Sequence, residues 1–405
     1  MPETKQKKII FLTNLNILGG TENNLVSIVT HPEFMNAFHS WIFSGTRPHP
    51  VIMSRLKKTD TKVIQHNTLM GIRTPRILRD RLFKRHLRKI RPDIVVFWNH
   101  VAKSRQLSIC KELSIKTVFF ERGTGWRDHN PTCMKRFLTS VDRVLSNSRA
   151  GGRILSARWG YEGECLVLPN AVRPEIASSK AEGVKYEKNR ALRIGVAARL
   201  VAYKGVASAV LAMKELKNQG VKAELHIAGD GPEADILRSL SSDLNVRTRF
   251  YGAIDDMAGF YRKIDILVVP SIREPFGTVA IEAQALGRPV LCSAVDGLPE
   301  VIIQGKTGYF IEPTLEIEGY LEFAAQKNNI PGLVYYPQKN KLNRPKALDP
   351  GKIASVIAQM ISDPGKITRM SNDAAVLIRE KFNFEKYVRN LIENIRRIIE
   401  SPSRP

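Results

Sequence analysis

The chain has 405 residues, of which 43% are hydrophobic and 25% charged, a balance that excludes wholesale disorder. No apolar stretch reaches the roughly 20 residues of a membrane-spanning helix. The four cysteines form no CxxC pair, which excludes the usual zinc spacing and predicts reduced thiols. The formal net charge of +24 predicts a surface that attracts polyanions; nucleic acid, anionic lipid and a phosphorylated acceptor all remain open.

Short runs rich in Val, Ile, Leu and Phe alternate with helix-length segments along the chain. This is the pattern of strands buried on both faces of a parallel sheet. The first run follows a basic stretch but is too short for a signal peptide, so we predict a buried strand there. The predicted strands are 9–13, 94–97, 117–120, 143–146, 194–198, 224–228, 266–269 and 290–292. Their alternation with helices predicts an α/β fold of doubly wound parallel sheets.

A change to polar composition after Val172 predicts a boundary between two domains, since the length suffices for two. A stretch rich in Asn, Pro, Lys and Tyr at about 324–348 predicts an insertion or long loop. The chain ends on a helical pattern with one apolar side, which we expect to pack back on the N-terminal domain. The predicted segments are an N-terminal domain (1–172), a linker (173–190), a second domain (191–386) and a C-terminal helix (387–405).

Two glutamates, Glu274 and Glu282, flank the start of a predicted helix after a buried strand. Amides at a helix N-terminus suit phosphate oxygens, which makes Phe276, Gly277 and Thr278 candidates for phosphate contacts. A carboxylate accepts hydrogen bonds from adjacent hydroxyls, as on a ribose or a hexose. The pair can therefore hold sugar rings at both ends of a diphosphate. The alternative is a helix cap and a solvated surface residue.

Three further loops in the same half carry candidate groups. Arg199 and Lys204 are cations at the carboxyl end of a strand, where open α/β sheets bind ligands. Arginine can grip phosphate with two hydrogen bonds, and lysine acts as a point charge. Gly229 begins a glycine turn, and Ile254 lies in a loop whose backbone could face a nucleobase.

Together these motifs resemble glycosyltransferase family 4, whose members are retaining enzymes of the GT-B fold. The resemblance rests on an RLxxxKG setting around Arg199 and Lys204, a GDGP turn from Gly229, a PSxxEPFG loop and the EX7E pair Glu274/Glu282. It covers about residues 191–312 closely. It implies two Rossmann-like domains facing across a cleft and a nucleotide-diphosphate sugar as donor, with a UDP-sugar favoured.

The resemblance also implies roles for single residues. Arg199 and Lys204 would hold the diphosphate, Glu282 the ribose, and Glu274 the hydroxyls of the donor sugar. The leaving phosphate would take the proton of the acceptor hydroxyl, with no metal ion or other cofactor. On this basis, replacing Lys204 or Glu282 with alanine is predicted to abolish transfer with the fold intact. A GT-B epimerase or a sugar-nucleotide-binding protein without transferase activity is the rival interpretation.

The N-terminal half matches the family more loosely. Gly19 and Gly20 are similar to a GGxE loop whose amides approach the donor phosphate, although a tight turn without a ligand is the alternative. Family members often carry a histidine where this chain has Glu121 and Arg122. We expect Glu121 to contact the sugar or the acceptor hydroxyl, and Arg122 to read an acidic acceptor. His100, after strand 94–97, is a further acceptor-site candidate or a polar residue beside the site.

The segment 73–91 is nearly all cationic around an apolar stripe. It predicts an amphipathic helix with the stripe packed inward and the cations outward, facing water or anionic lipid. A glycolipid, lipopolysaccharide-core or other cell-envelope glycan acceptor would agree with such a helix. The expectation is a cytoplasmic enzyme, peripheral at the inner face of a membrane. A nucleic-acid partner is not expected, because no zinc spacing, aromatic RNA-binding motif or helix-turn-helix signature is present.

Overall fold

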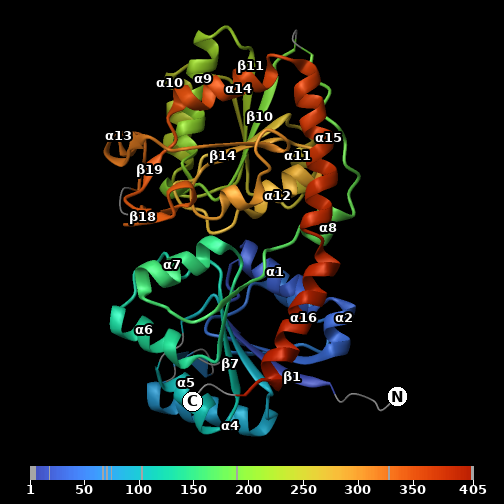
Figure 1. Cartoon of the computed structure of the whole chain (residues 1–405), viewed down its shortest axis with the longest axis vertical. Coiled ribbons are helices and arrows are strands. Elements are labelled where there is room, and N and C mark those ends of the chain that lie inside the picture. The colour runs from blue at the N-terminus through green and yellow to red at the C-terminus, as the bar shows by residue number, and fades with distance from the viewer. Residues whose placement is uncertain are drawn as a thin grey trace. The chain divides into compact units, whose positions relative to one another are not determined.

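The computed structural model describes residues 6–17, 19–65, 68–69, 72–73, 75–101, 104–187, 190–326 and 329–402. The chain forms two compact units (Figure 1). Unit 1 comprises Met1–Asn170 and Glu385–Pro405, and unit 2 comprises Ala171–Phe384. Each unit has its own parallel sheet. Within the described ranges, no helix is both long and apolar enough to cross a bilayer.

Unit 1 is built on a seven-stranded sheet of order β3-β2-β1-β6-β7-β8-β9, in which all paired strands are parallel. The strand order reverses between β1 and β6, where Ile9 lies opposite Ile94. The strands are β1 (Lys7–Thr13), β2 (Phe38–Ser44), β3 (Lys62–Gln65), β6 (Ile94–Trp98), β7 (Lys116–Glu121), β8 (Arg143–Ser146) and β9 (Cys165–Val167). A separate hairpin consists of β4 (Thr68–Leu69) and β5 (Ile72–Arg73).

Helices follow most of these strands. They are α1 (Gly20–Val29), α2 (Pro32–Ala37), α3 (Pro50–Leu56), α4 (Arg76–Ile90), α5 (Ser104–Glu112), α6 (Pro131–Ser140), α7 (Arg149–Trp159) and α16 (Phe384–Glu400). The last helix, α16, packs on unit 1 through a buried apolar side that includes Val388 and Leu391. Its Tyr387 hydroxyl donates to Asn24 Oδ1 over 3.3 Å. The C-terminal helix is therefore part of the N-terminal unit's structure.

Unit 2 contains a six-stranded parallel sheet of order β12-β11-β10-β13-β14-β15. The strands are β10 (Leu192–Ala197), β11 (Ala223–Ala228), β12 (Thr248–Gly252), β13 (Ile266–Val269), β14 (Val290–Ser293) and β15 (Gly308–Ile311). The order reverses between β10 and β13. In a doubly wound sheet this reversal opens a crevice at the carboxyl ends of the two strands, where ligands bind.

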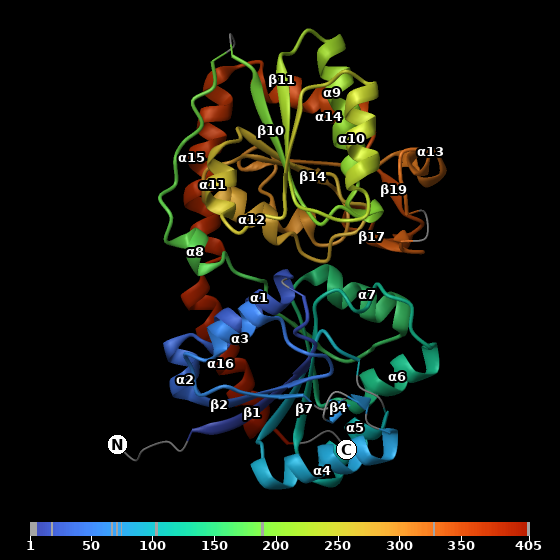
Figure 2. The same ribbon diagram turned by 180° about the vertical axis from the view of Figure 1, so that it is seen from behind.

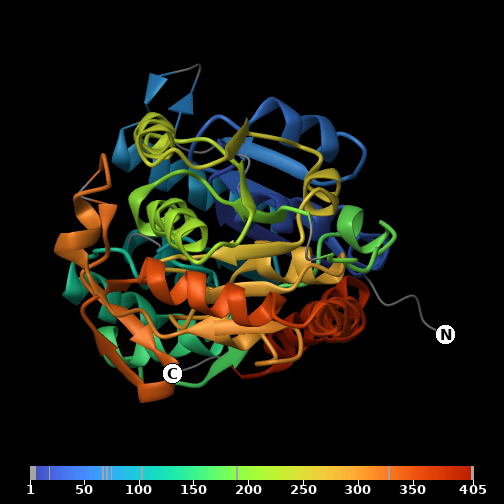
Figure 3. The ribbon, with the colours of Figure 1, turned by 90° about the horizontal axis from the view of Figure 1, so that it is seen from above.

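Helices cover both faces of this sheet (Figures 2 and 3). One core lies under α9, α10 and α14, and the other lies under α8, α11 and α12. The helices of unit 2 are α8 (Pro174–Ala177), η1 (Ala202–Lys204), α9 (Val206–Asn218), α10 (Ala234–Asp243), α11 (Met257–Arg262), α12 (Thr278–Ala285), η2 (Leu298–Val301), α13 (Ile317–Leu321), η4 (Pro337–Lys339), α14 (Pro350–Ile361) and α15 (Pro364–Lys381).

All eight predicted strands are confirmed, with ends that differ from the prediction by at most two residues. The parallel strands missed by the prediction, such as β2 and β12, are not continuous apolar runs, because His39 and Ser40 interrupt β2 and β12 is an edge strand. The described part of the segment predicted as a linker belongs to unit 2, because Val184 and Tyr186 are buried in its core.

The stretch predicted as an insertion contains regular structure. Its hairpin is formed by β17 (Val334–Tyr336) and β18 (Lys341–Asn343), which pair antiparallel. Next to the hairpin, β19 (Lys346–Ala347) pairs with β16 (Leu315–Glu316). In Figure 1 these elements lie beside the sheet of unit 2, on the side where α13 is labelled.

Candidate functional site

Two loops of unit 2 meet where the strand order reverses. The loop after β10 (198–205) and the loop after β13 (270–277) are joined by the backbone N–H of Ile272, which donates to the carbonyl of Tyr203 over 2.9 Å. Lys204 Nζ lies 2.5 Å from Glu274 Oε2, and the two side chains are 19% and 13% exposed. The structure therefore brings Lys204 and Glu274 together as a part-buried ion pair at the predicted ligand edge.

Two arginines lie in the same two loops, Arg199 in the loop with Lys204 and Arg273 in the loop with Glu274. Arg199 is exposed, and within the described residues its side chain has no hydrogen-bond or ion-pair partner. Arg273 lies with its guanidinium 4.6 Å from the ring centre of Tyr203, and its Nε is buried without a hydrogen-bond partner among the described residues. Sequence reasoning missed Arg273; its position next to Glu274 was the available signal.

Glycines allow the site loops to touch. A Cβ at Gly205 would lie 1.9 Å from the carbonyl oxygen of Pro270, so the loops after β10 and β13 approach too closely for any side chain. A Cβ at Gly229 would lie 1.8 Å from the carbonyl oxygen of Ala198. The glycine turn after β11 is therefore required for loop packing, independently of any ligand.

Replacing Gly229 with alanine is expected to destabilise unit 2 by several kcal/mol, roughly the range of severe single substitutions. The matched control is Gly220→Ala, because Gly220 also has positive φ (+74°) but meets nothing within 4 Å. The control should lose only about 1 to 2 kcal/mol, the usual left-handed penalty. Denaturant unfolding would measure both. Equal losses would contradict the close approach at Ala198.

Helix α12 begins where the sequence predicts a helix start, directly after the loop that carries Glu274. Gly277 is its N-cap at φ +100°, and Thr278 is its first residue. The side chain of Phe276 is only 2% exposed and packs edge-on against Phe382, so a donor contact from Phe276 is limited to its backbone. Ile254, in the loop after β12, is half-buried against the same core. These placements leave the backbone amides as the groups that can meet a phosphate.

Glu282 is held inside unit 2. Its side chain is 2% exposed, and Arg173 binds both of its oxygens, with Nε–Oε1 at 2.5 Å and Nη2–Oε2 at 3.0 Å. The buried hydroxyl of Tyr261 donates to Oε2 over 3.1 Å. Burial and the Glu282 carboxylate raise the pKa of Tyr261, which keeps its hydroxyl protonated. Arg173 was missed by the sequence analysis because it lies 109 residues from Glu282.

This pairing rules out the alternative in which Glu282 is a solvated surface residue. Alanine at this position would leave Arg173 without its partner, so we expect it to lower the stability of unit 2 as well as activity. Removing one member of a buried ion pair typically costs about 3 to 5 kcal/mol. A carboxylate offers about four acceptor positions. Three of them are occupied here, two at Oε2 and one at Oε1.

The corresponding edge of unit 1 begins with Gly19, the N-cap of α1, and Gly20, its first residue. The carboxylate of Glu22 folds back over this cap, since a Cβ on Gly19 would lie 2.4 Å from Glu22 Oε2. Burial raises the pKa of Glu22, while the backbone N–H groups of Glu22 and Gly19 act in the opposite direction. His100 lies half-buried two residues after β6. The helix start is thus occupied by a carboxylate of this chain.

Glu121 and Arg122, at the end of β7, are buried rather than open to substrate. The Glu121 side chain accepts the backbone N–H groups of Gly123 and Gly125, the latter over 2.9 Å. The Arg122 guanidinium lies 4.4 Å from the ring centre of Trp98, and its Nη2 donates to Asn170 Oδ1 over 2.8 Å. Burial lowers the pKa of Arg122. The structure does not support the expectation of direct substrate contact: Glu121 holds its own loop, and Arg122 is held between Trp98 and Asn170.

Glu121 makes the stability of unit 1 depend on pH. Burial raises the pKa of its carboxyl to about 7, so the folded state keeps a proton that the unfolded state loses above about pH 4.3. The free energy of unfolding contributed by this group therefore falls as pH rises between these values. Between pH 5 and pH 8, the free energy of unfolding of Glu121→Gln is expected to rise by roughly 2 kcal/mol relative to that of wild type. Unfolding of both proteins at the two pH values would test this; parallel profiles would contradict it.

Metal chemistry was not expected from the sequence. Among the described residues, no three His, Cys, Asp or Glu side chains gather as they would to hold a metal ion. Asp256, in the loop after β12, accepts the N–H of Gly259 over 2.8 Å and caps α11. The four cysteines are free thiols.

The sequence of unit 2 is similar to known glycosyltransferases. Residues 179–325 match the family described as Glycosyl transferases group 1. An uncharacterised glycosyltransferase of Methanocaldococcus jannaschii is 29% identical over 214 residues, which is 52% of this chain and 45% of that protein. A glycogen synthase of Mycobacterium tuberculosis is 38% identical over 119 residues, 28% of this chain and 29% of that protein. The chain thus spans less than half the length of these relatives.

Solved structures match over nearly the whole chain. A glycosyltransferase of Rickettsia africae has a TM-score of 0.75 at 17% identity, covering 98% of this chain and 100% of that one. HepE of Anabaena, in complex with UDP-glucose, has a TM-score of 0.69 at 16% identity, covering 96% and 99%. WaaG, a glycosyltransferase involved in lipopolysaccharide biosynthesis, has a TM-score of 0.64 at 14% identity, covering 96% and 99%. At such identities the likeness establishes the fold, and the prediction of two Rossmann-like sheets is confirmed. Residues 179–325 therefore resemble the Glycosyl transferases group 1 family, within a chain of the GT-B fold.

Proposed function

We propose that this chain is a retaining glycosyltransferase of family 4 that moves a hexose-type sugar from a UDP-sugar to a glycan or glycolipid. The observation that carries the proposal is the Lys204–Glu274 ion pair at the strand-order reversal, with Arg199 exposed in the loop that carries Lys204. Such a site combines cations for a diphosphate with a carboxylate for sugar hydroxyls. Glu282 is the proposed partner of the ribose.

In the proposed reaction the acceptor hydroxyl attacks the anomeric carbon from the face that the nucleotide leaves. The bond between that carbon and the phosphate oxygen breaks, and the departing phosphate takes the hydroxyl proton. Arg199, Lys204 and the first amides of α12 stabilise the negative charge that develops on the diphosphate. Because these fixed groups supply the positive charge, the proposal includes no metal ion or other cofactor.

The choice of substrates rests on the structural neighbours. HepE was crystallised with UDP-glucose, which supports a UDP-sugar as donor. WaaG acts in lipopolysaccharide biosynthesis, which supports a lipopolysaccharide-core or other cell-envelope glycan as acceptor. Both assignments rest on likeness of fold, and a screen of nucleotide sugars tests the donor.

Binding of nucleotide sugars is the first test. Calorimetry or thermal shift with UDP-glucose, UDP-galactose and UDP-N-acetylglucosamine should reveal a ligand that stabilises the protein by about 2.7 kcal/mol at a hundredfold excess over its Kd. Product analysis would then show transfer with retained anomeric configuration. A donor converted only to its epimer would favour the rival enzyme activity, and binding without turnover would favour a binding protein. Absence of binding by any nucleotide sugar would overturn the proposal.

We further propose that unit 1 docks on the cytoplasmic face of a membrane through α4. Ile77 and Leu78, at the start of this helix, are 70% and 42% exposed, an unusual position for large apolar side chains. Arg81, Arg85 and Arg88 are exposed along the same helix. Exposed apolar groups beside cations suit the boundary of an anionic bilayer, where each cation contributes about 1 kcal/mol.

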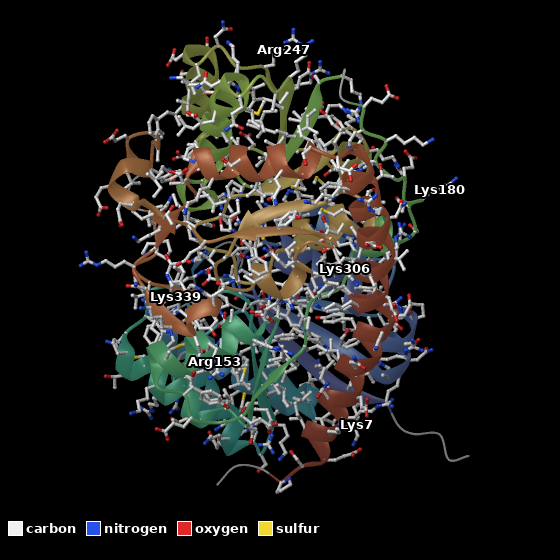
Figure 4. All side chains as sticks on the ribbon, turned by 45° about the horizontal axis from the view of Figure 1, so that its top comes forward. Lys7, Arg153, Lys180, Arg247, Lys306 and Lys339 are labelled. Atoms are coloured by element: carbon white, nitrogen blue, oxygen red, sulfur yellow. The ribbon has the colours of Figure 1, made fainter. Side chains whose placement is uncertain are left out.

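Vesicle binding tests this surface. The double variant Arg85→Glu/Arg88→Glu is expected to lose most binding to vesicles containing phosphatidylserine or phosphatidylglycerol, measured by co-sedimentation at low salt. The matched control is Lys180→Glu/Lys306→Glu, which changes the net charge equally at exposed lysines of unit 2 (Figure 4). Equal losses would show that total charge, not α4, drives binding. No binding by wild type at low salt would remove the membrane proposal.

A further inference from the structure

The segment from β16 to β19 (315–347) is tied to the loops of the candidate site. The hydroxyl of Tyr320 donates to the carbonyl of Ala202, in the loop after β10, over 2.8 Å. The buried carboxylate of Glu233, in the turn after β11, accepts the N–H groups of Ala325 and Gln326 over 2.9 and 2.8 Å. These contacts hold the segment at the carboxyl edge of the sheet of unit 2.

A third tie reaches Glu274 itself. Asp296, in the loop after β14, is fully buried. Its Oδ1 accepts the N–H of Tyr335 in β17 over 2.9 Å, and its Oδ2 accepts the N–H of Glu274 over 3.0 Å. One carboxylate thus connects the β17–β18 hairpin to the residue that pairs with Lys204.

Backbone contacts surround this carboxylate on both sides. The N–H of Asp296 donates to the carbonyl of Tyr335 over 2.8 Å, and the N–H of Gly297 donates to the carbonyl of Glu274 over 3.1 Å. Asp296 has φ +49°, a left-handed conformation that is strained for a non-glycine residue. Glycine would adopt this backbone conformation more easily than aspartate. The presence of aspartate therefore indicates that the hydrogen bonds of its side chain are needed at this position.

We infer that Asp296 is a positioning residue, through which the β17–β18 hairpin sets the place of Glu274 and thereby helps to select the donor sugar. The inference rests on the proposed function. Asp296 acts on Glu274 through the backbone amide, so its loss should mainly displace the carboxylate that faces the sugar. The affinity for the nucleotide part of the donor should therefore not change when Asp296 is replaced.

The test compares UDP with UDP-sugars in Asp296→Gly. Glycine accepts φ +49° without strain and removes both side-chain hydrogen bonds. The affinity for UDP should stay within twofold of wild type. The affinity for the best UDP-sugar should fall at least tenfold, and the kcat/KM ratio between UDP-glucose and UDP-galactose should move toward one.

The matched control is Asn245→Gly. Asn245 follows α10 with nearly the same backbone conformation, φ +48°, outside the site loops. It should leave all of these values unchanged. Asp296→Asn, which keeps one oxygen acceptor, is the second variant if glycine prevents folding; it should show the same changes to a smaller degree.

The outcomes separate this inference from the proposed function. Wild type that binds neither UDP nor any UDP-sugar overturns the function itself. Wild type that binds them, with Asp296 variants that discriminate sugars as wild type does, overturns only the positioning role. Equal losses for UDP and UDP-sugar would mean general damage to the site and would also overturn that role.

Discussion

Replacing Lys204 with methionine is expected to lower kcat/KM by about 10²- to 10³-fold, the usual effect of removing one group that stabilises transition-state charge. Methionine keeps the length and apolar stem of the side chain but removes the ammonium that lies 2.5 Å from Glu274. The loss should appear mainly in kcat, because charge on the leaving diphosphate grows as the bond breaks. Steady-state kinetics with the donor found by the binding screen would measure it.

Two controls separate chemistry from stability in this experiment. Lys214→Met removes an exposed lysine on α9, away from the site loops, and should leave the kinetics unchanged. The double variant Lys204→Met/Glu274→Gln removes the unpaired carboxylate that the single variant leaves part-buried. It should regain stability without regaining activity. Undiminished turnover by Lys204→Met would contradict the assignment of this edge as the donor site.

The Arg173–Glu282 pair gives the second large effect. Arg173→Met should lower the free energy of unfolding by about 3 kcal/mol or more, because it leaves the buried Glu282 carboxylate without its counterpart. Glu282→Gln should lower it less, because the Arg173 side chain that it leaves is 28% exposed. The double variant should be less destabilised than the sum of the two, with a coupling of about 1 to 3 kcal/mol. Denaturant unfolding of the four proteins completes the cycle. Strict additivity would mean that the pair contributes no coupling.

An ion-pair network around the buried carboxylate of Asp265, which Arg190 and Arg193 both bind, provides the control for function. Arg190 binds Asp265 with Nη1–Oδ2 at 2.6 Å and Nη2–Oδ1 at 2.9 Å, at the amino end of β13. Arg190→Met should also destabilise unit 2 but should not change donor affinity, because it lies at the opposite edge of the sheet. Arg173→Met and Glu282→Gln should weaken donor binding as well. Equal donor affinity in all three variants would contradict a ribose role for Glu282.

Much of the fold was predictable because its signal is local. A strand buried on both faces must be a short apolar run, and eight such runs became strands. The strands that were missed have polar positions or lie at an edge, where water accepts a polar side chain. The hairpin of β17 and β18 was also missed, because each strand has only three residues and its position depends on Asp296, which binds the backbone of Tyr335.

The candidate site divides in the same way. Arg199, Lys204 and Glu274 were predicted from their place after buried strands, because parallel strands deliver their carboxyl ends to one edge. The burial of Glu121 and Arg122 was not predicted. A residue at the end of a strand has the same sequence pattern whether the following loop leaves it open to solvent or folds over it.

The amino-acid sequence alone therefore determined which chemical groups stand at the carboxyl ends of the strands, because hydrophobic spacing and motif order are written along the chain. Only the tertiary structure decided which of those groups are open to a ligand and which are bound to one another. Arg173 and Glu282 meet across 109 residues, and Asp296 joins Glu274 to Tyr335. Such contacts depend on how helices and loops pack over the sheet, a long-range property that no local pattern records.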